Sequence, residues 1–223
     1  MEGYRNLVKI VSKASTEGFN YKPRTDHDLL RQYSKGIIAL SACIQGEVPQ
    51  YILQDNMEGA RRDVEWYIET FGKDNFFLEI QNHGLPEELR AQQVLCQLAD
   101  EYGLGIVASN DFHYVMKDDA DAQDIRVCIQ TGRRRAEVDR LKFPNDGSIS
   151  NLGTRWRSLW TLPGALENTV KIADRCNVEF ILMNTICPTL MCPRRNVKTY
   201  LHKVCERNTS LIRRYLRLKT PRL

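Results

Sequence analysis

Three short apolar segments alternate with helix-like segments, and this order constrains the fold more than any other feature of the chain. The segments are rich in β-branched and aromatic residues and read "KGIIALSAC", "NFFLEIQ" and "LGIVAS". Between them lie stretches with apolar residues at helical spacing, "MEGARRDVEWYIETFG" and "LPEELRAQQVLCQLADEYG". Strands that alternate with helices are typical of α/β folds with parallel strands. We therefore predict an α/β fold.

The expected helices carry start and stop signals. Thr25 or Asp26 can cap a short helix, and Pro86 lies in the first turn of a longer one. Gly72 and Gly103 follow the last apolar positions of two helices, where glycine favours a helix end. These signals place each helix between two expected strands.

Composition limits the class of protein. The 223 residues suffice for one domain or a domain with an appendage, and contents of 42% hydrophobic and 27% charged residues are those of a soluble globular chain. No apolar run approaches the length of a bilayer span, and the first residues predict an amphipathic helix rather than a signal peptide. Seven cysteines without a CxxC pair indicate reduced thiols. We expect a cytoplasmic protein with no membrane contact.

Polar side chains follow the carboxyl ends of all three expected strands. Cys43 ends the first strand, His83 follows the second, and Asp111 and His113 follow the third in "IVASNDFHYV". Ligands of α/β proteins gather at the carboxyl ends of parallel strands. We therefore expect these side chains to contribute to one polar site.

Cysteine, histidine and aspartate are also common metal ligands. The structural alternatives are a capping role for Asp111, a backbone contact for His113, a turn position for His83 and a core position for Cys43. Spacing alone leaves both interpretations open.

The remaining candidates favour structural roles. We interpret His27 and His202 as surface residues, and Trp156 and Trp160 as packing residues rather than a base-stacking platform. The net charge of +4 is concentrated in "TGRRRAEVDRLK" and "RRYLRLKTPRL", which we interpret as solvated surface, with contact to DNA phosphates as the alternative. The sequence lacks a P-loop, a GxGxxG turn and a GxSxG elbow, which argues against nucleotide-cofactor and serine-hydrolase functions.

Several blocks of the sequence resemble the bacterial DNA polymerase III alpha subunits, in their N-terminal polymerase-and-histidinol-phosphatase (PHP) domain. The order and spacing of the blocks are similar over roughly residues 4–146 and again over 162–180. The blocks are "EGFNYKPRTDHDLL", "GIIALSACIQGEVP", "FFLEIQNHGLPEE", "LGIVASNDFHYVMKDDADAQDIRVCIQTG" and "PGALENTVKIADRCNVEF".

The resemblance implies a distorted (β/α) barrel of the PHP type whose rim binds a cluster of divalent metal ions, either zinc, manganese or iron. It implies Cys43, Asp111 and His113 as metal ligands and His83 as a further one. The activity that it implies is metal-dependent 3′-5′ exonuclease or phosphoesterase chemistry, within a parent subunit that synthesises DNA. DNA and other replicase subunits would be the partners of that parent.

The sequence also departs from this family. The His-x-His motif and the acidic and histidine ligands that follow it in the family lie before the residues that match Met1, and the catalytic aspartates of the polymerase palm lie well downstream. We therefore expect an incomplete barrel and an incomplete metal cluster, assign no catalytic residue, and expect this chain alone to be inactive.

A second departure lies between Asp146 and Leu162, where the family has a segment like "DQFYLKTPEEM" and this chain reads "DGSISNLGTRWRSLW". Suitable codons for residues 147–150 give Asp-Gln-Phe in a shifted frame. After Phe180, suitable codons for "TICPTLMCPRR" give His-Leu-Pro-Asn-Phe-Asp-Val-Pro-Gln-Glu, which is similar to the family's continuation. On this frame-shift hypothesis Cys187 and Cys192 have no chemical role, and residues 147–160 and 181–196 pack poorly. The nucleotide sequence tests it.

The resulting organisation has three parts. Residues 1–146 are the C-terminal part of a PHP domain, 147–196 are a connection that contains a helix at 162–177, and 197–223 begin a following helical region. Two alternatives to the replicase function remain: a freestanding PHP phosphoesterase that acts on a small phosphate ester, and a non-catalytic module that supports a polymerase or docks a partner.

Overall fold

Three parallel strands form the sheet that positions the candidate site. The computed structural model describes residues 1–143, 148–150 and 162–180. Within these residues the strands are β1 (Ala39–Leu40), β2 (Phe76–Ile80) and β3 (Gly105–Ala108), in the order β1-β2-β3. Both neighbouring pairs are parallel. The predicted α/β fold with parallel strands is confirmed for this part of the chain.

The first strand is shorter than the sequence indicates. The apolar run at 35–43 predicts a strand that ends at Cys43, but only Ala39 and Leu40 form it. The backbone N–H of Ser41 still donates to the carbonyl oxygen of Phe77 at 3.0 Å. Ala42 then adopts a positive φ of 63°, which is incompatible with an extended strand. The predicted length is therefore wrong at both ends of this strand.

Helices connect the strands as expected, and their caps follow the sequence signals. Asp26 caps α2 by accepting from the N–H of Leu29 at 2.8 Å, and Gly103 ends α5 in the left-handed conformation. The short 3-10 helices η1 and η2 span Lys73–Asn75 and Lys117–Asp119. The α-helices are α1 (Glu2–Thr16), α2 (His27–Gln32), α3 (Glu47–Leu53), α4 (Met57–Phe71), α5 (Pro86–Tyr102), α6 (Ala120–Thr131) and α8 (Ala165–Arg175).

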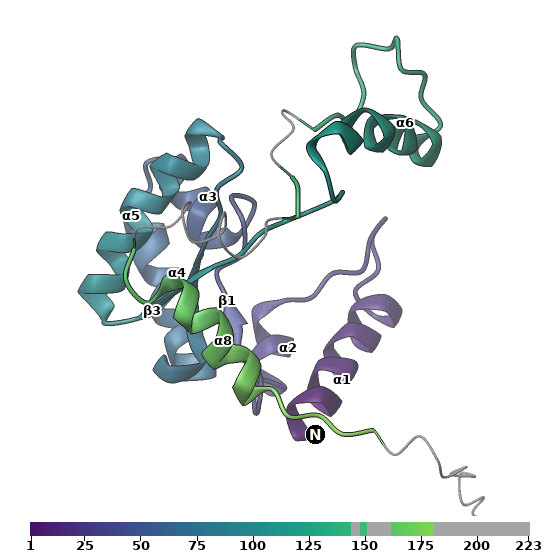
Figure 1. The fold of residues 1–223 in the computed structure, drawn as a ribbon. Helices are drawn as coiled ribbons and strands as arrows, with labels where there is room; N and C mark the ends of the chain where they lie inside the picture. The colour runs from purple at the N-terminus through teal and green to yellow at the C-terminus, as the bar shows by residue number, and fades with distance from the viewer. Residues whose placement is uncertain (144–147, 151–161, 181–223) are drawn as a thin grey trace, which may run out of the picture. The chain divides into compact units, whose positions relative to one another are not determined.

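The hydrophobic core surrounds β2, whose side chains alternate between fully and partly buried positions. Phe76, Leu78 and Ile80 are buried and contact the core faces of α4 and α5, which include Val64 and Leu98. Figure 1 shows these helices beside the sheet and α8 running close to β3. The amide of Asn168 in α8 donates to the carbonyl oxygen of Ile106 at 2.7 Å. The helix expected at 162–177 thus packs against the sheet.

Residues 148–150 form a short backbone pairing with the segment after β3. Tyr114 and Ile149 make an isolated parallel bridge, and the N–H of Ser150 donates to the carbonyl oxygen of Tyr114 at 3.0 Å. Ser148 and Ile149 are buried. The expectation of poor packing is therefore wrong for Ser148 and Ile149, whereas Ser150 is exposed. The other residues of 147–160 and 181–196 lie outside the described part, as do 197–223.

Among the described residues, no helix combines the length and apolar character that crossing a membrane requires.

Candidate functional site

The predicted site residues all lie past the carboxyl ends of the parallel strands. Cys43 follows β1, His83 follows β2, and Asp111 and His113 follow β3. Because the strands are parallel and adjacent, their carboxyl ends meet at one edge of the sheet. The sequence therefore placed these residues correctly with respect to the sheet.

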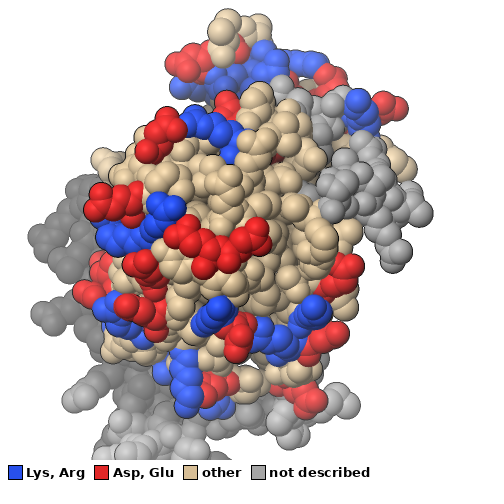
Figure 2. Space-filling view, turned by 90° about the vertical axis from the view of Figure 1, so that its left-hand side faces the viewer, with Lys and Arg blue, Asp and Glu red and all other residues tan. Residues whose placement is uncertain are grey.

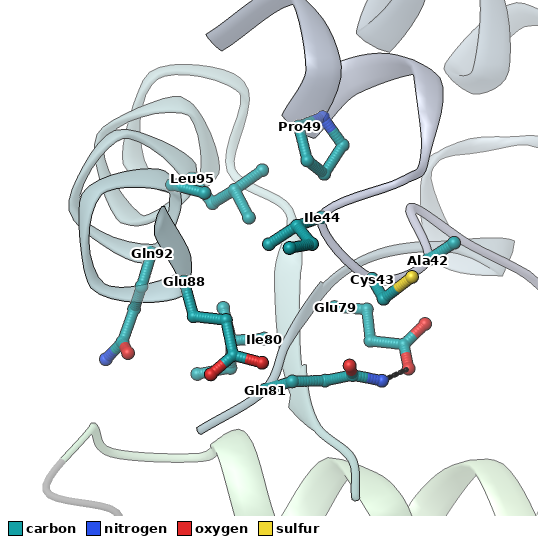
Figure 3. A pocket seen from close by; sticks show the side chains of 11 residues that line it. Ala42, Cys43, Ile44, Pro49, Glu79, Ile80, Gln81, Glu88, Gln92 and Leu95 are labelled. Atoms are coloured by element: carbon teal, nitrogen blue, oxygen red, sulfur yellow. Dashed lines mark hydrogen bonds between the residues drawn. The ribbon is translucent and has the colours of Figure 1, made fainter. Parts of the chain in front are cut away.

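Cys43 lines a narrow cleft between β2 and the start of α5. The turn at Ala42 brings the partly buried thiol of Cys43 to this cleft, which Glu79, Gln81 and Glu88 also line. Figure 3 shows Cys43 beside Glu79 and Gln81, with Glu88 entering from α5. Cys43 is thus a partly buried thiol at a cleft that both apolar and polar side chains line.

A polar cluster at the ends of β2 and β3 was not predicted from the sequence. The hydroxyl of Ser109 donates to the Glu79 carboxylate. The amide of Gln81 donates to Ser109 Oγ at 3.1 Å and to Glu79 Oε1 at 3.4 Å. The available signal was Glu79 itself, a carboxylate within the otherwise apolar strand "FFLEI". These three residues connect the carboxyl ends of β2 and β3.

Asp111 and His113 form the pair that the Asp-x-His spacing predicts. Nε2 of His113 lies 3.2 Å from Oδ2 of Asp111, and the two side chains are 35% and 63% exposed. The backbone N–H of His113 donates to the carbonyl oxygen of Ser148 at 3.0 Å, and its ring contacts Phe143 at a centroid distance of 4.6 Å. The pair is therefore accessible and anchored through its backbone.

His83 lies next to the backbone of Asp111 and is hydrogen-bonded to a buried carboxylate. Its Nδ1 is 2.7 Å from Oε1 of Glu88, and the side chains are only 9% and 5% exposed. The hydrogen bond that His83 donates to Glu88 raises the pKa of His83 against the lowering effect of burial. Burial raises the pKa of Glu88, but the hydrogen bonds from His83 outweigh it and leave that pKa below its ordinary value. Glu88 was not among the residues expected from the sequence.

The donor chemistry of these residues suits a metal, but the described residues do not complete a site. Asp111 and His113 are adjacent, whereas no three His, Cys, Asp or Glu side chains in the described part of the chain are arranged to hold a metal ion. A stable protein site for zinc or a similar cation needs at least three protein ligands. The described residues alone therefore do not fit the expected metal cluster, and Cys43, Asp111, His113 and His83 stay predictions as ligands.

The basic segment after α6 is extensively paired with carboxylates. Arg133 lies 3.1 Å from Glu137, and Arg140 binds Asp124 at 2.6 Å, with Arg135 nearby at 3.6 Å from the same aspartate. On the face shown in Figure 2, Lys and Arg side chains are interspersed with Asp and Glu side chains. Both observations favour the solvated-surface interpretation over contact with DNA phosphates.

The other residues that the sequence singled out divide into two groups. The His27 side chain is 40% exposed, yet it stacks on Trp66 at a centroid distance of 3.8 Å, so it is only partly the surface residue that we expected. His202, Trp156, Trp160, Cys187 and Cys192 lie outside the described residues.

Comparison with known proteins relates the first part of the chain to a family. Residues 1–83 match the family model of the PHP domain. These residues are part of a PHP domain. The match includes β1, β2 and two of the candidate residues, Cys43 and His83.

The similarity continues beyond the PHP match into β3 and α8. The chain is 46% identical over 183 residues to the DNA polymerase III subunit alpha of Deinococcus radiodurans, which covers 80% of this chain and 14% of that relative. The identity to the Thermus aquaticus subunit is 44% over 183 residues, with 79% of this chain and 15% of the relative covered. For Treponema pallidum it is 40% over 192 residues, with 86% and 16% covered. The chain thus spans about one seventh of the length of these relatives.

Proposed function

We propose that this chain is a section of a replicative DNA polymerase of the polymerase III alpha type, and that it supplies part of the PHP domain of that enzyme. The observation that carries the proposal is the 46% identity over 183 residues to a subunit of that name. The parent enzyme would synthesise DNA in the cytoplasm. Its partners would be DNA and the other replicase subunits.

The proposed fold of the parent domain is a PHP-type barrel, of which β1, β2 and β3 are one part. The parallel order of the three strands and the helices between them support this proposal. The polar side chains at the carboxyl strand ends support it as well, because that edge is where barrels of alternating strands and helices place their sites.

In the parent domain, Asp111 and His113 would serve as two ligands of a divalent metal cluster, with Cys43 as a third. The 3.2 Å contact between Asp111 and His113 supports their joint role. The proposed chemistry of the complete domain is metal-dependent 3′-5′ exonuclease or phosphoesterase hydrolysis. Because the described residues do not complete a metal site, we expect the chain alone to bind metal weakly and to hydrolyse DNA little or not at all.

Two experiments test this proposal. The first incubates the purified chain with 3′-labelled DNA and Mn²⁺ or Zn²⁺, with Asp111→Ala as the matched variant. Nucleotide release should stay at background for both proteins, and robust release by the unaltered chain that Asp111→Ala abolishes would refute its inactivity. Hydrolysis of histidinol phosphate without release from DNA would favour the freestanding phosphoesterase.

The second experiment places the chain in its proposed context. The matching section of the Thermus aquaticus alpha subunit is replaced by residues 1–180 of this chain, and DNA synthesis and bound metal are measured. We expect a chimera that synthesises DNA and binds metal, with metal content reduced by Asp111→Ala. A soluble chimera that synthesises DNA but binds no metal would favour the non-catalytic module.

A further inference from the structure

The buried side chain of Glu88 joins the start of α5 to the loop before it. Glu88 is the third residue of α5, where backbone N–H groups lack helical partners. Its Oε2 accepts from the N–H of His83 at 2.7 Å and from the N–H of Leu85 at 3.4 Å. Its other oxygen, Oε1, lies 2.7 Å from Nδ1 of His83. One carboxylate therefore fixes both the backbone and the ring of His83.

This contact determines which nitrogen of His83 carries the proton. An ionised carboxylate accepts hydrogen bonds and donates none, so Nδ1 of His83 must donate to Glu88. In the neutral ring Nε2 is then an acceptor, because only one of the two nitrogens is protonated. The backbone N–H of Asp111 donates to this Nε2 at a distance of 3.3 Å.

We propose that Glu88 and His83 are positioning residues, which hold the backbone of Asp111 and thereby orient the Asp-x-His segment that follows β3. Both nitrogens of the His83 ring have protein partners in this arrangement, which favours a positioning role over the ligand role expected from the sequence. That this positioning helps Asp111 to bind a metal rests on the proposed function. The hydrogen bonds from Glu88 through His83 to Asp111 do not depend on that function.

The segment that His83 holds has no regular structure of its own. Residues 109–113 follow the end of β3, and the Asp111 side chain is 63% exposed, so side-chain packing does little to fix this residue. The described anchors are hydrogen bonds: Asp111 to His83, the side chain of Asn110 to the carbonyl of Ile149, and His113 to Ser148. The His83 contact connects Asp111 to the segment after β2, and the bond from Gln81 to Ser109 connects the same two segments nearer the sheet. A buried partner of this kind orients residues that act on a ligand.

Two substitutions of His83 separate positioning from simple packing. Gln places its terminal amide near the position of Nε2, so His83→Gln keeps an acceptor for the Asp111 N–H. Asn reaches only to the position of Nδ1, so His83→Asn loses that acceptor. Glu88→Gln removes one of the two acceptor oxygens, and Glu87→Gln on the exposed face of the same turn is the matched control.

The measurement is hydrogen exchange of the Asp111 amide by NMR in the whole chain, without metal, with a chelator present and at a pH where the His83 ring is neutral. We expect exchange to accelerate roughly tenfold in His83→Asn and Glu88→Gln, and to stay near the unaltered rate in His83→Gln and Glu87→Gln. The amides of Val107 and Ala108 in β3 report whether the sheet remains folded. Equal exchange of Asp111 in His83→Asn and the unaltered chain, with β3 intact, would overturn the proposal.

A second measurement needs no variant. Long-range ¹⁵N spectra of the unaltered chain, at a pH where the His83 ring is neutral, should show the proton on Nδ1, whereas free histidine prefers Nε2. A proton on Nε2 would contradict the arrangement even if every variant failed to fold. Because neither measurement uses metal or substrate, failure here leaves the proposed metal ligands untouched, and failure of metal binding leaves this proposal standing.

Discussion

Nε2 of His27 lies 3.0 Å from Oε2 of Glu47, and the hydroxyl of Tyr67 donates to the same oxygen at 2.8 Å. The three residues come from α2, α3 and α4, so a single carboxylate oxygen connects three helices. Burial raises the pKa of Glu47, but the hydrogen bonds from His27 and Tyr67 lower it to a net value below the ordinary one. The network therefore stabilises the ionised form of Glu47 in the folded state.

Removal of the Tyr67 hydroxyl should destabilise the chain. Tyr67→Phe deletes a donor to a charged acceptor, and we expect a loss of about 1–2 kcal/mol in the free energy of unfolding at pH 7. Tyr102→Phe is the matched control, because the partly buried Tyr102 donates at the same 2.8 Å to Glu65, whose carboxylate does not connect three helices, and it should cost less. Urea unfolding of both variants measures the difference, and a larger loss in Tyr102→Phe would contradict the assigned role.

The pH dependence of this stabilisation follows from the direction in which folding shifts the pKa of Glu47. A carboxyl group whose pKa is lowered by folding stabilises the native state above its ordinary pKa and loses that contribution as pH falls through the lowered value. We expect Glu47→Gln to be less stable than the unaltered chain at pH 7, and the difference to shrink on acidification below about pH 4. A difference that stays constant from pH 7 to pH 3 would show that the charge of Glu47 plays no part.

Folding shifts the pKa of Asp63 in the opposite direction, so its effect on stability should have the opposite pH dependence. Burial raises its pKa, the nearby charge of Glu47 raises it further, and Arg62, at 3.7 Å, compensates only in part. A raised carboxyl pKa means that the folded state binds more protons, so this contribution to stability falls as pH rises from the ordinary pKa through the raised one. Asp63→Asn should therefore unfold at a higher temperature at pH 7 and show no gain below about pH 3.

The control for this change is Asp118→Asn, at an exposed position, which should leave the melting temperature within the small range of ordinary surface substitutions. A lower melting temperature for Asp63→Asn at pH 7 would mean that the pair with Arg62 contributes more than burial costs.

The sequence predicted the elements well where periodicity and caps agreed. The run between Pro86 and Gly103 and the strand around Leu78 lie where the patterns placed them, because helix caps and apolar spacing are local properties. The first strand was predicted too long, since an apolar run does not reveal that Ala42 turns into the left-handed region.

The candidate site was predictable in its location and not in its contacts. Alternation of strands and helices suffices to bring Cys43, His83 and Asp111 to one edge of the sheet. It says nothing of the hydrogen bonds of Glu88, which depend on the exact start of α5 and on the direction of one side chain. The carboxylate of Glu79 was missed for the same reason, because its partner Ser109 is distant in the sequence.

The core around β2 should dominate the stability of the described part of the chain. Leu78 is completely buried between the helices, so Leu78→Ala leaves a cavity and should cost about 2–5 kcal/mol in the free energy of unfolding. Leu89, on the outer face of α5, is 51% exposed, and Leu89→Ala should change stability by less than about 1 kcal/mol. Chemical denaturation of both variants checks the contrast, and similar losses would mean that β2 is not the core strand.

The last prediction concerns the contact between α8 and β3. The 2.7 Å hydrogen bond from Asn168 to the carbonyl oxygen of Ile106 is partly buried and satisfies a backbone acceptor of β3, and loss of such a bond costs about 1 kcal/mol. Asn168→Ala should lower the free energy of unfolding by that amount. Asn177→Ala removes only the 3.0 Å bond to the nearby Asp174 carbonyl and should have little effect.

Hydrogen exchange locates this effect in the structure. Backbone amides of β3, Val107 among them, should exchange faster in Asn168→Ala than in Asn177→Ala, because α8 protects this strand from solvent opening. If β3 amides exchange alike in both variants while global stability is unchanged, α8 does not pack on the sheet in solution. Faster exchange in Asn168→Ala would instead establish that residues 162–180 fold together with the sheet that presents Asp111. These residues follow the stretch between Asp146 and Leu162, where the sequence departs from the family.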